Sequence, residues 1–553
     1  MQRAKDKRLT AEHRNAIEPH FDVAYYLDAN PDVRKAGVDP LEHYVTWGWR
    51  EGRNPSRRFD VAYYLACNSD VAAANIDPLL HYVWSGRQEG RPAIRPLSAY
   101  RFQMAAAMGP RRKSLEWGSN PRDIPPAAPD AFERIAGQRG MILSISHDDY
   151  ASNTGGVQNL IGDEQRAFNL AGWSYLHLSP ALPLPMLADP QSEHDFRVGI
   201  RLDGTPVGSL SVADLAEMLA GLSRHVGRIE AIVHHLMGHV PELIAQLIRA
   251  SGASRTIIWT HDFFTLCPSY TLMRNDIVFC GGPTPTSPAC GVCCYGDERS
   301  AHVGRMSDFF KSVQPMVMAP SQSALDLWRH DNALSHDGAV VQPLARLALA
   351  APTLAEAFGT AGKPLRIAHI GARVFHKGWT VFEDLALRFA DDPRYSFMQI
   401  GASHGPGMPG HIRQIPVQVT AENRGAMIDA IAEAGVDVAI IWSLWPETFC
   451  YVVHEALAGG AFVLARRAAG NVDPVITAAA PERGHLVDDE AGLTRLFEGD
   501  GLKTLISESP RRRGALVLGD GTFDWLRRQP GVIADVSGAR NLSQMALEDP
   551  VHG

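Results

Sequence analysis

Two series of short apolar segments, separated by amphipathic helical segments, constrain the fold of this chain more than any other feature. Alternation of buried strands with helices is typical of doubly wound α/β folds, in which the strands form a largely parallel sheet. We therefore expect two such domains, at residues 138–345 and 363–490, joined by an alanine-rich linker at residues 346–362. The strands of the first domain are expected within residues 141–149, 173–180, 231–238, 255–262, 315–321 and 339–344, with a hairpin at 196–212. Those of the second are expected within residues 364–372, 395–402, 416–421, 436–442 and 461–467, and helices follow at residues 491–553.

Length and charge narrow the class of protein. The chain has 553 residues, which suggests about three to four domains. Its net charge of −8 argues against nonspecific binding to nucleic acid, which requires a basic surface. The first twenty residues lack the apolar segment of a secretory signal, and no apolar run reaches the roughly 18 residues of a membrane span. We therefore expect a cytoplasmic protein with reduced cysteines.

An internal repeat precedes the first α/β domain. The segments FDVAYYLDANPDVRKAGVDPLEHYVTWGWREGR and FDVAYYLACNSDVAAANIDPLLHYVWSGRQEGR begin at Phe21 and Phe59, so the period is 38 residues. Repeats of this length are stacked supersecondary units, here with a helix on each side of a turn at an Asp-Pro pair. Two units are too few for a free-standing array, so residues 21–92 are expected to dock on the rest of the chain or on a partner protein.

Polar and proline-rich residues flank the repeats. Residues 1–20 are expected to form a tail, and residues 93–137 a linker. The linker contains three consecutive basic residues, Arg111, Arg112 and Lys113, which could contact anionic lipid. A peripheral association with the inner face of the membrane is therefore left open, although so short a basic run is usually just solvated.

The segment WSLWPETFCYVVHEALAGG, residues 442–460, combines an expected anion site with two carboxylates. Pro446 is suited to the first turn of a helix, and the two final glycines would terminate that helix. We thus expect Glu447 at the helix N-terminus, where free N–H groups bind phosphate, and Glu455 about two turns along. A carboxylate does not bind phosphate but accepts strongly from hydroxyl groups. Phosphates flanked by hydroxyls are a feature of sugar nucleotides, although the spacing alone also fits a surface helix with two chance acids.

Three further motifs follow expected strands. Gly155 and Gly156 come after the first strand, where glycines let the backbone approach a phosphate or merely form a turn. His261 ends another strand, where it could serve a sugar hydroxyl or an oxyanion, or be a structural histidine. The loop GARVFHKG, residues 371–378, follows the first strand of the second domain. Ligands of such sheets bind beyond the carboxyl ends of the strands, so these motifs are expected to share one cleft.

Taken together, the GGV loop, the HDFF…CP segment, the Lys-Gly loop and the Glu-x7-Glu pair resemble the motifs of retaining GT-B glycosyltransferases of the family-four type. The resemblance covers about residues 140–490. It implies two Rossmann-like domains that face a cleft, the first binding the acceptor and the second the sugar nucleotide. It also implies that Gly155 and Gly156 lie near the donor diphosphate, and that His261 is a catalytic residue close to the transferred sugar.

The same resemblance implies roles for residues of the second domain. Lys377 would neutralise the leaving diphosphate, which is electrostatic stabilisation of developing charge. Glu455 would bind the ribose hydroxyls, and Glu447 the hydroxyls of the transferred sugar rather than act as a nucleophile. Thr448 and Phe449 would offer backbone N–H groups to sugar and phosphate. Because lysine and helix N-termini supply the positive charge, no metal or other cofactor is implied for catalysis.

One position departs from the family pattern. The family carries an arginine in the loop before the Lys-Gly pair, and this chain has Ala372 there, with Arg373 one residue later. Arg373 could replace the family arginine from a shifted backbone and bind the donor, or it could point into the domain.

Five cysteines crowd into residues 267–294, an insert in the first domain, and Cys294 directly follows the last of the four that could form one set. Cys267, Cys280, Cys290 and Cys293 have the spacing C-x12-C-x9-C-x2-C, which resembles a structural zinc knuckle. A disulfide pair and free packed thiols are the alternatives.

The resemblance as a whole implies an enzyme that transfers a sugar, with retention, from a nucleotide-diphosphate sugar to a glycan or lipid-linked acceptor in surface polysaccharide or glycoconjugate synthesis. The repeats agree with this, since they resemble helical units found beside glycosyltransferase domains in bacterial cell-surface polysaccharide proteins. One alternative is a GT-B sugar-nucleotide epimerase or hydrolysing relative, which would lack the Glu-x7-Glu helix. Another is a non-catalytic sugar-nucleotide-binding subunit of an assembly, which the missing arginine leaves open.

Overall fold

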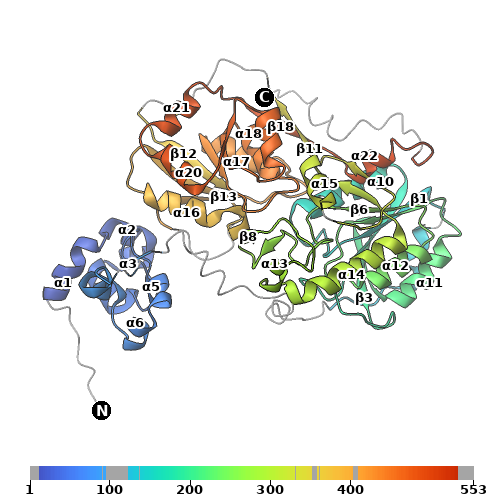
Figure 1. Cartoon of the computed structure of the whole chain (residues 1–553), viewed down its shortest axis with the longest axis horizontal. Coiled ribbons are helices and arrows are strands. Elements are labelled where there is room, and N and C mark those ends of the chain that lie inside the picture. Colours follow the sequence, from blue (N-terminus) through green and yellow to red (C-terminus); the bar gives the residue numbers. More distant parts are fainter. Residues whose placement is uncertain are drawn as a thin grey trace, which may run out of the picture.

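The computed structural model describes residues 11–89, 91, 93–94, 123–135, 137–330, 332–350, 358–359, 362–402 and 409–533. Figure 1 shows a small helical domain at one end, a second α/β domain beside it and the first α/β domain at the far end. No helix of the described residues is both long and apolar enough to cross a membrane. The basic residues at 111–113 and the last twenty residues, 534–553, lie outside the described residues.

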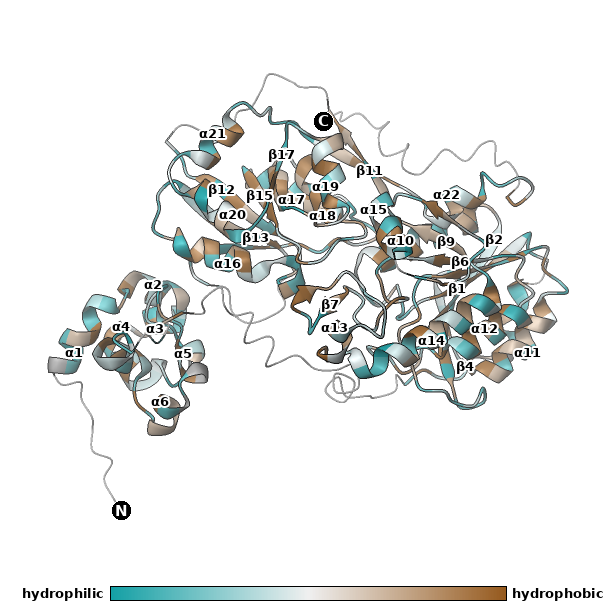
Figure 2. Ribbon diagram, viewed as in Figure 1, coloured by the Kyte–Doolittle hydropathy of each residue, from teal (hydrophilic) through white to brown (hydrophobic). Residues whose placement is uncertain are grey.

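The first α/β domain contains a sheet with the strand order β10-β9-β6-β5-β1-β2-β3-β4. Its strands are parallel except for the expected hairpin of β3 and β4, which joins the sheet antiparallel to β2. Buried apolar side chains cover both faces of the sheet. Figure 2 shows the hydropathy of each residue along the ribbon. The strands are β1 (Gly140–Ile145), β2 (Trp173–Pro180), β3 (Arg197–Leu202), β4 (Thr205–Ser211), β5 (Ile229–Val233), β6 (Thr256–Trp259), β9 (Met316–Ala319) and β10 (Gly338–Val341). The main helices are α10 (Gly156–Leu170), α11 (Val212–Leu222), α12 (Pro241–Ala250), α14 (Gly296–Val313) and α15 (Gln322–Arg329).

The second α/β domain contains a six-stranded parallel sheet in the order β14-β13-β12-β15-β16-β17. The two doubly wound domains expected from the sequence are therefore confirmed. The edge strands were not predicted correctly: β14 covers Ile412–Pro416, ahead of the expected 416–421, and β17 (Gly484–Val487) was missed. An edge strand is paired on one side only, so its sequence carries a weaker apolar pattern. The other strands are β12 (Leu365–Ile370), β13 (Tyr395–Gly401), β15 (Val438–Ile441) and β16 (Phe462–Arg466), and the helices are α16 (Trp379–Arg388), α17 (Ala426–Ala434), α18 (Tyr451–Ala458), α20 (Glu490–Phe497) and α21 (Gly501–Ser507).

The C-terminal segment returns to the first domain. After α21, strand β18 (Gly514–Leu518) pairs antiparallel with β11 (Ala345–Leu349), so the start of the expected linker is a strand. Helix α22 (Thr522–Leu526) then packs against α10. Residues 351–357 and 360–361 of that linker lie outside the described residues.

The two repeats form equivalent helical units. Each expected Asp-Pro turn is a helix N-cap instead: Asp39 accepts from the N–H groups that open α4 (Pro40–His43), and Asp77 does the same for α7 (Pro78–His81). An additional helix, α3 (Pro31–Ala36) or α6 (Ser69–Ala74), precedes each N-cap and follows α2 (Val23–Ala29) or α5 (Val61–Cys67). The tail contributes a helix of its own, α1 (Ala11–Ile17).

The repeats contact the second α/β domain through few groups. Arg58 Nη2 donates to Asp391 Oδ2 at 2.7 Å, and both side chains are largely exposed. Of the expected linker at 93–137, residues 95–122 lie outside the described part of the chain. Its last residues belong to the first domain, because residues 125–127 pair along β4 and the following 3-10 helix, Pro129–Ile135, buries Phe132.

Candidate functional site

Loops of the two α/β domains meet at the carboxyl ends of their strands. The loop after β1 opens α10 at Gly156, and a Cβ atom at this glycine would lie only 3.2 Å from the Tyr451 ring, at the start of α18. The hydroxyl of Thr448 donates to the carbonyl of His261. One residue separates His261 from the end of β6. Ser321 of the first domain donates to the carbonyl of Thr448 at 2.7 Å. The glycine pair, His261 and the 442–460 segment are therefore brought together.

The helix expected to begin at Pro446 begins at Tyr451 instead. Residues 447–449 are not helical, because Glu447 makes a short bridge to Gly470: its N–H donates to Ala469 O at 3.1 Å, and its carbonyl accepts from Asn471 N at 2.8 Å. This close approach requires glycine at 470, since a Cβ there would lie 2.4 Å from Glu447 O. The expected end of the helix at Gly459 is confirmed.

Lys377 and Glu447 form a tight ion pair. Lys377 Nζ donates to Glu447 Oε1 and Oε2 at 2.6 and 2.7 Å, and Ser443 Oγ donates to Oε1 at 2.6 Å. Glu447 is 3% exposed. Burial alone would lower the pKa of Lys377, but Glu447 reverses this, and the net pKa is raised. The lysine therefore remains a cation beside a carboxylate.

Glu455 is a buried carboxylate with no protein partner in the described part of the chain. It lies in the second turn of α18 and is 7% exposed. Burial raises its pKa to about 7. It lies in the same region as Glu447, since both carboxylates add to the effect of burial, which is the largest cause, in raising the pKa of Cys450 to about 12. A buried acid that binds nothing in the protein is suited to a ligand hydroxyl.

The backbone of residues 448–449 has unused donors. Within the described residues, the N–H groups of Thr448 and Phe449 donate to no protein acceptor. The Phe449 ring stacks on His454 at 4.9 Å and packs against the apolar core of the first domain. Its N–H is thus held in place, and the two adjacent N–H groups could bind an anion or a sugar oxygen.

Arg373 lies in the loop before Lys377, and its guanidinium is 5.8 Å from the centre of the Trp379 ring, on the first helix of the second domain. Ala372, at the family arginine's position, is exposed. The expected contact of Arg373 with the donor stays a prediction.

His261 is held by groups that sequence reasoning missed. It is 9% exposed, its ring stacks on Trp259 at 5.0 Å, and its Nε2 lies 3.1 Å from His234 Nδ1. Burial lowers the pKa of His261 well below its usual value, so the ring is neutral. A signal was available: His234 and His235 are two polar residues at the end of an otherwise apolar strand.

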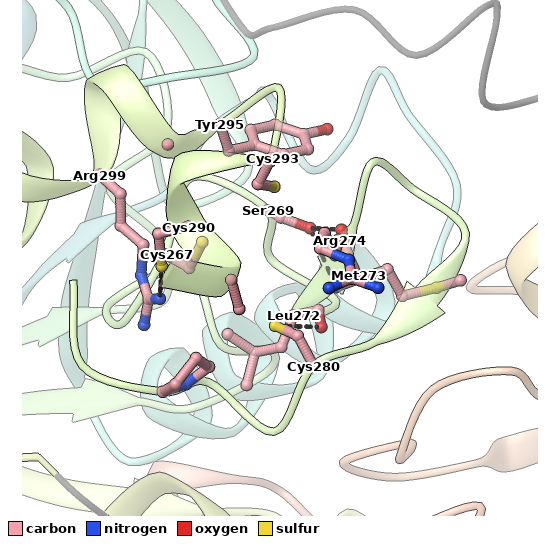
Figure 3. A pocket seen from close by; sticks show the side chains of 13 residues that line it. Cys267, Ser269, Leu272, Met273, Arg274, Cys280, Cys290, Cys293, Tyr295 and Arg299 are labelled. Atoms are coloured by element: carbon pink, nitrogen blue, oxygen red, sulfur yellow. Dashed lines mark hydrogen bonds between the residues drawn. The ribbon is translucent and has the colours of Figure 1, made fainter. Parts of the chain in front are cut away.

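The four cysteines line one cavity of about 20 Å³ (Figure 3). Arg299 Nη1 donates to Cys290 Sγ at 2.7 Å, and burial raises the pKa of Cys267 to about 12. In the described part of the chain, no three His, Cys, Asp or Glu side chains lie close enough together to hold a metal ion. All six cysteines with described side chains are free, so no disulfide forms either. The arrangement fits packed thiols, and the expected zinc set of Cys267, Cys280, Cys290 and Cys293 is not assembled.

Comparison with known proteins adds likeness to solved structures only. No protein-family description and no curated protein matches the chain. Anabaena HepE, solved with UDP and glucose, is 12% identical with a TM-score of 0.38, over 67% of this chain and 93% of its own. A trehalose-phosphate synthase (UDP-forming) from Burkholderia xenovorans is 12% identical with a TM-score of 0.38, over 68% and 93%. The lipopolysaccharide outer core galactosyltransferase WaaB is 11% identical with a TM-score of 0.37, over 66% and 90%.

The fold is of the GT-B class. Its defining features are in the chain itself: two doubly wound sheets whose strand ends face each other and a C-terminal helix that returns to the first domain. At the interface of the two domains lie a cation, Lys377, and the N–H groups of residues 448–449, together with the carboxylates of Glu447 and Glu455.

Proposed function

We propose that the protein is a retaining glycosyltransferase that moves a sugar from a nucleotide-diphosphate sugar to a glycan or lipid-linked acceptor. Three observations support this: Lys377 pairs with Glu447, the neighbouring Thr448 bonds to His261 of the other domain, and the buried Glu455 has no partner within the described residues. Transfer would take place in the cytoplasm, in the synthesis of a surface polysaccharide or glycoconjugate.

The diphosphate would be held by Lys377 and by the unused N–H groups of Thr448 and Phe449. An ammonium group has three donors, so Lys377 can keep a bond to Glu447 and still donate to a phosphate oxygen. Gly156 opens α10 directly opposite α18, and its N-terminal N–H groups add to the positive potential. These groups stabilise the negative charge that develops on the leaving diphosphate, which is the main catalytic effect proposed here.

The two acids would bind hydroxyl groups. Glu455, buried and unpaired, accepts from the ribose, and Glu447, fixed by Lys377 and Ser443, accepts from the transferred sugar. Fixing the carboxylate before the ligand arrives reduces the entropy lost on binding. The departing phosphate assists removal of the acceptor's proton on the same face of the sugar, which gives retention.

The test uses purified full-length protein and a panel of sugar nucleotides in a thermal-shift assay, because a ligand that binds only the folded state raises its melting temperature. With the best ligand, Glu455→Ala should weaken nucleotide binding, whereas Glu447→Ala should lower turnover more than binding. Glu433→Ala, at an exposed acid of the same domain, is the matched control and should change neither. Wild-type binding and turnover in both site variants would refute the proposal.

A non-catalytic sugar-nucleotide-binding subunit is the second candidate, because Ala372 stands where the family resemblance implies an arginine for the diphosphate. In that case the nucleotide would bind and no sugar would be transferred to any acceptor, and residues 21–92 would hold the subunit in its assembly.

A further inference from the structure

A line of three buried polar side chains runs from the core of the first domain to His261. Glu164 lies in α10, His234 directly follows β5, and His261 follows β6. His261 Nε2 lies 3.1 Å from His234 Nδ1, and His234 Nε2 lies 3.2 Å from Glu164 Oε2. The side chains of Glu164 and His234 are fully buried. The proposed function uses only the last of the three.

Glu164 is surrounded by donors. Its Oε1 accepts from Thr522 N at 2.6 Å, and its Oε2 accepts from the Tyr175 hydroxyl at 3.3 Å. The His234 N–H is not well aligned on Oε2, but the ring nitrogen has no other acceptor within the described residues, so the carboxylate is its partner. The Thr522 N–H can only donate, and His234 offers a ring nitrogen, so each oxygen of the Glu164 carboxyl group has a nitrogen within reach.

The carboxyl group of Glu164 sets the order of hydrogen-bond donors and acceptors from His234 to His261. With a neutral ring, His234 directs its one proton from Nε2 to Glu164 and leaves Nδ1 as an acceptor. His261 then donates from Nε2 to His234, and since His261 is neutral, its Nδ1 carries no proton. This Nδ1 has no partner in the described part of the chain.

The C-terminal segment that returns to the first domain contacts both Glu164 and Trp259. Thr522 donates its N–H to Glu164 and accepts at its hydroxyl from Trp259 Nε1 at 2.9 Å. The Trp259 ring in turn stacks on the His261 ring, with 7° between their planes. One residue from the far end of the chain therefore fixes both the carboxylate and the ring that orients His261.

We propose that Glu164 and His234 are positioning residues, which fix His261 with Nδ1 as a hydrogen-bond acceptor for a hydroxyl group of the sugar substrate. The sugar hydroxyl as the ligand of His261 rests on the proposed function, whereas the fixed tautomer of His261 does not. The consequence for chemistry is that His261 does not donate to an oxyanion; it accepts from an alcohol.

The tautomer can be read from the nitrogen and carbon NMR shifts of histidine-labelled full-length protein, with His261 assigned by its loss in His261→Gln. Wild type should show a proton on Nε2 of His261. Glu164→Gln should reverse the line: the amide oxygen stays on Thr522 N, its NH2 group faces His234, and His261 then carries its proton on Nδ1. Glu230→Gln, at another buried acid of the same domain, is the matched control and should leave His261 unchanged.

In the transferase assay, Glu164→Gln should lower kcat/KM about tenfold or more, since one lost hydrogen bond in the transition state of ~1.4 kcal/mol is a factor of ten. A proton on Nδ1 of His261 in the wild type would overturn the positioning role, and this measurement does not depend on any variant being folded. An unchanged tautomer of His261 in Glu164→Gln would overturn it as well. The expected tautomers in a protein that transfers no sugar would instead overturn the transferase assignment and leave the positioning role intact.

Discussion

Glu455→Gln should make the protein more stable at alkaline pH while it weakens nucleotide binding. The wild-type carboxyl is buried without a partner, and burial raises its pKa to about 7. In the unfolded chain a glutamate titrates near 4.3. The folded state therefore holds this proton more tightly, so stability is lost as pH rises from about 4.3 to about 7 and stays constant above that.

The size of the effect follows from the two pKa values. One pKa unit corresponds to about 1.4 kcal/mol, so ionising Glu455 costs on the order of 3 kcal/mol of unfolding free energy above pH 7. Glutamine has nearly the same shape and no charge, so the variant avoids this cost. For a domain of this size, about 1 kcal/mol shifts the melting temperature by roughly 2–4 °C, so several degrees are expected.

The assay is a series of thermal melts of wild type, Glu455→Gln and the exposed control Glu433→Gln between pH 5 and pH 8. The melting temperature of the variant should be nearest that of the wild type at pH 5, rise increasingly above it up to about pH 7 and exceed it by a constant amount from there to pH 8, whereas the control should follow the wild type throughout. At pH 8 a nucleotide should stabilise the wild type more than Glu455→Gln, because ribose hydroxyls donate best to a carboxylate. A variant that is less stable at pH 8, or a difference that does not change with pH, would show that Glu455 is not an unpaired buried acid.

Three shorter predictions concern other parts of the molecule. Lys377→Met should lower sugar transfer by roughly a hundredfold or more, the usual loss when a charge-stabilising donor is removed, and unchanged initial rates would exclude Lys377 from the diphosphate site. The purified protein should hold no stoichiometric zinc and should melt at the same temperature with and without chelator, as packed thiols require; one equivalent of zinc by metal analysis would show that the cysteine loop closes around an ion. Arg58→Ala should leave the melting temperature of the α/β domains unchanged, because its ion pair with Asp391 is largely exposed, and a clear drop would mean that the repeats support the second domain.

The sequence by itself determined the local elements and grouped several of the candidate site residues. The two series of strands, the glycine at the start of α10 and the end of α18 at Gly459 follow from patterns within about ten residues, because burial alternates with the period of each element. The 38-residue repeat likewise predicted equivalent helical units. Motif spacing also brought Lys377 and Glu447 to one site, since loops after parallel strands share an edge of the sheet.

Only the tertiary structure decided how distant segments modify these elements. The start of α18 moved from Pro446 to Tyr451 because Glu447 bonds to the backbone on both sides of Gly470, and a hydrogen bond to a distant segment outweighs the helix preference of a proline. The carboxylate of Glu164, which orders the protons of His234 and His261, is itself held by a residue 358 positions away. A local sequence pattern indicates whether a side chain is buried. Which residue that side chain contacts depends on how distant segments pack together, and a short stretch of sequence does not contain this information.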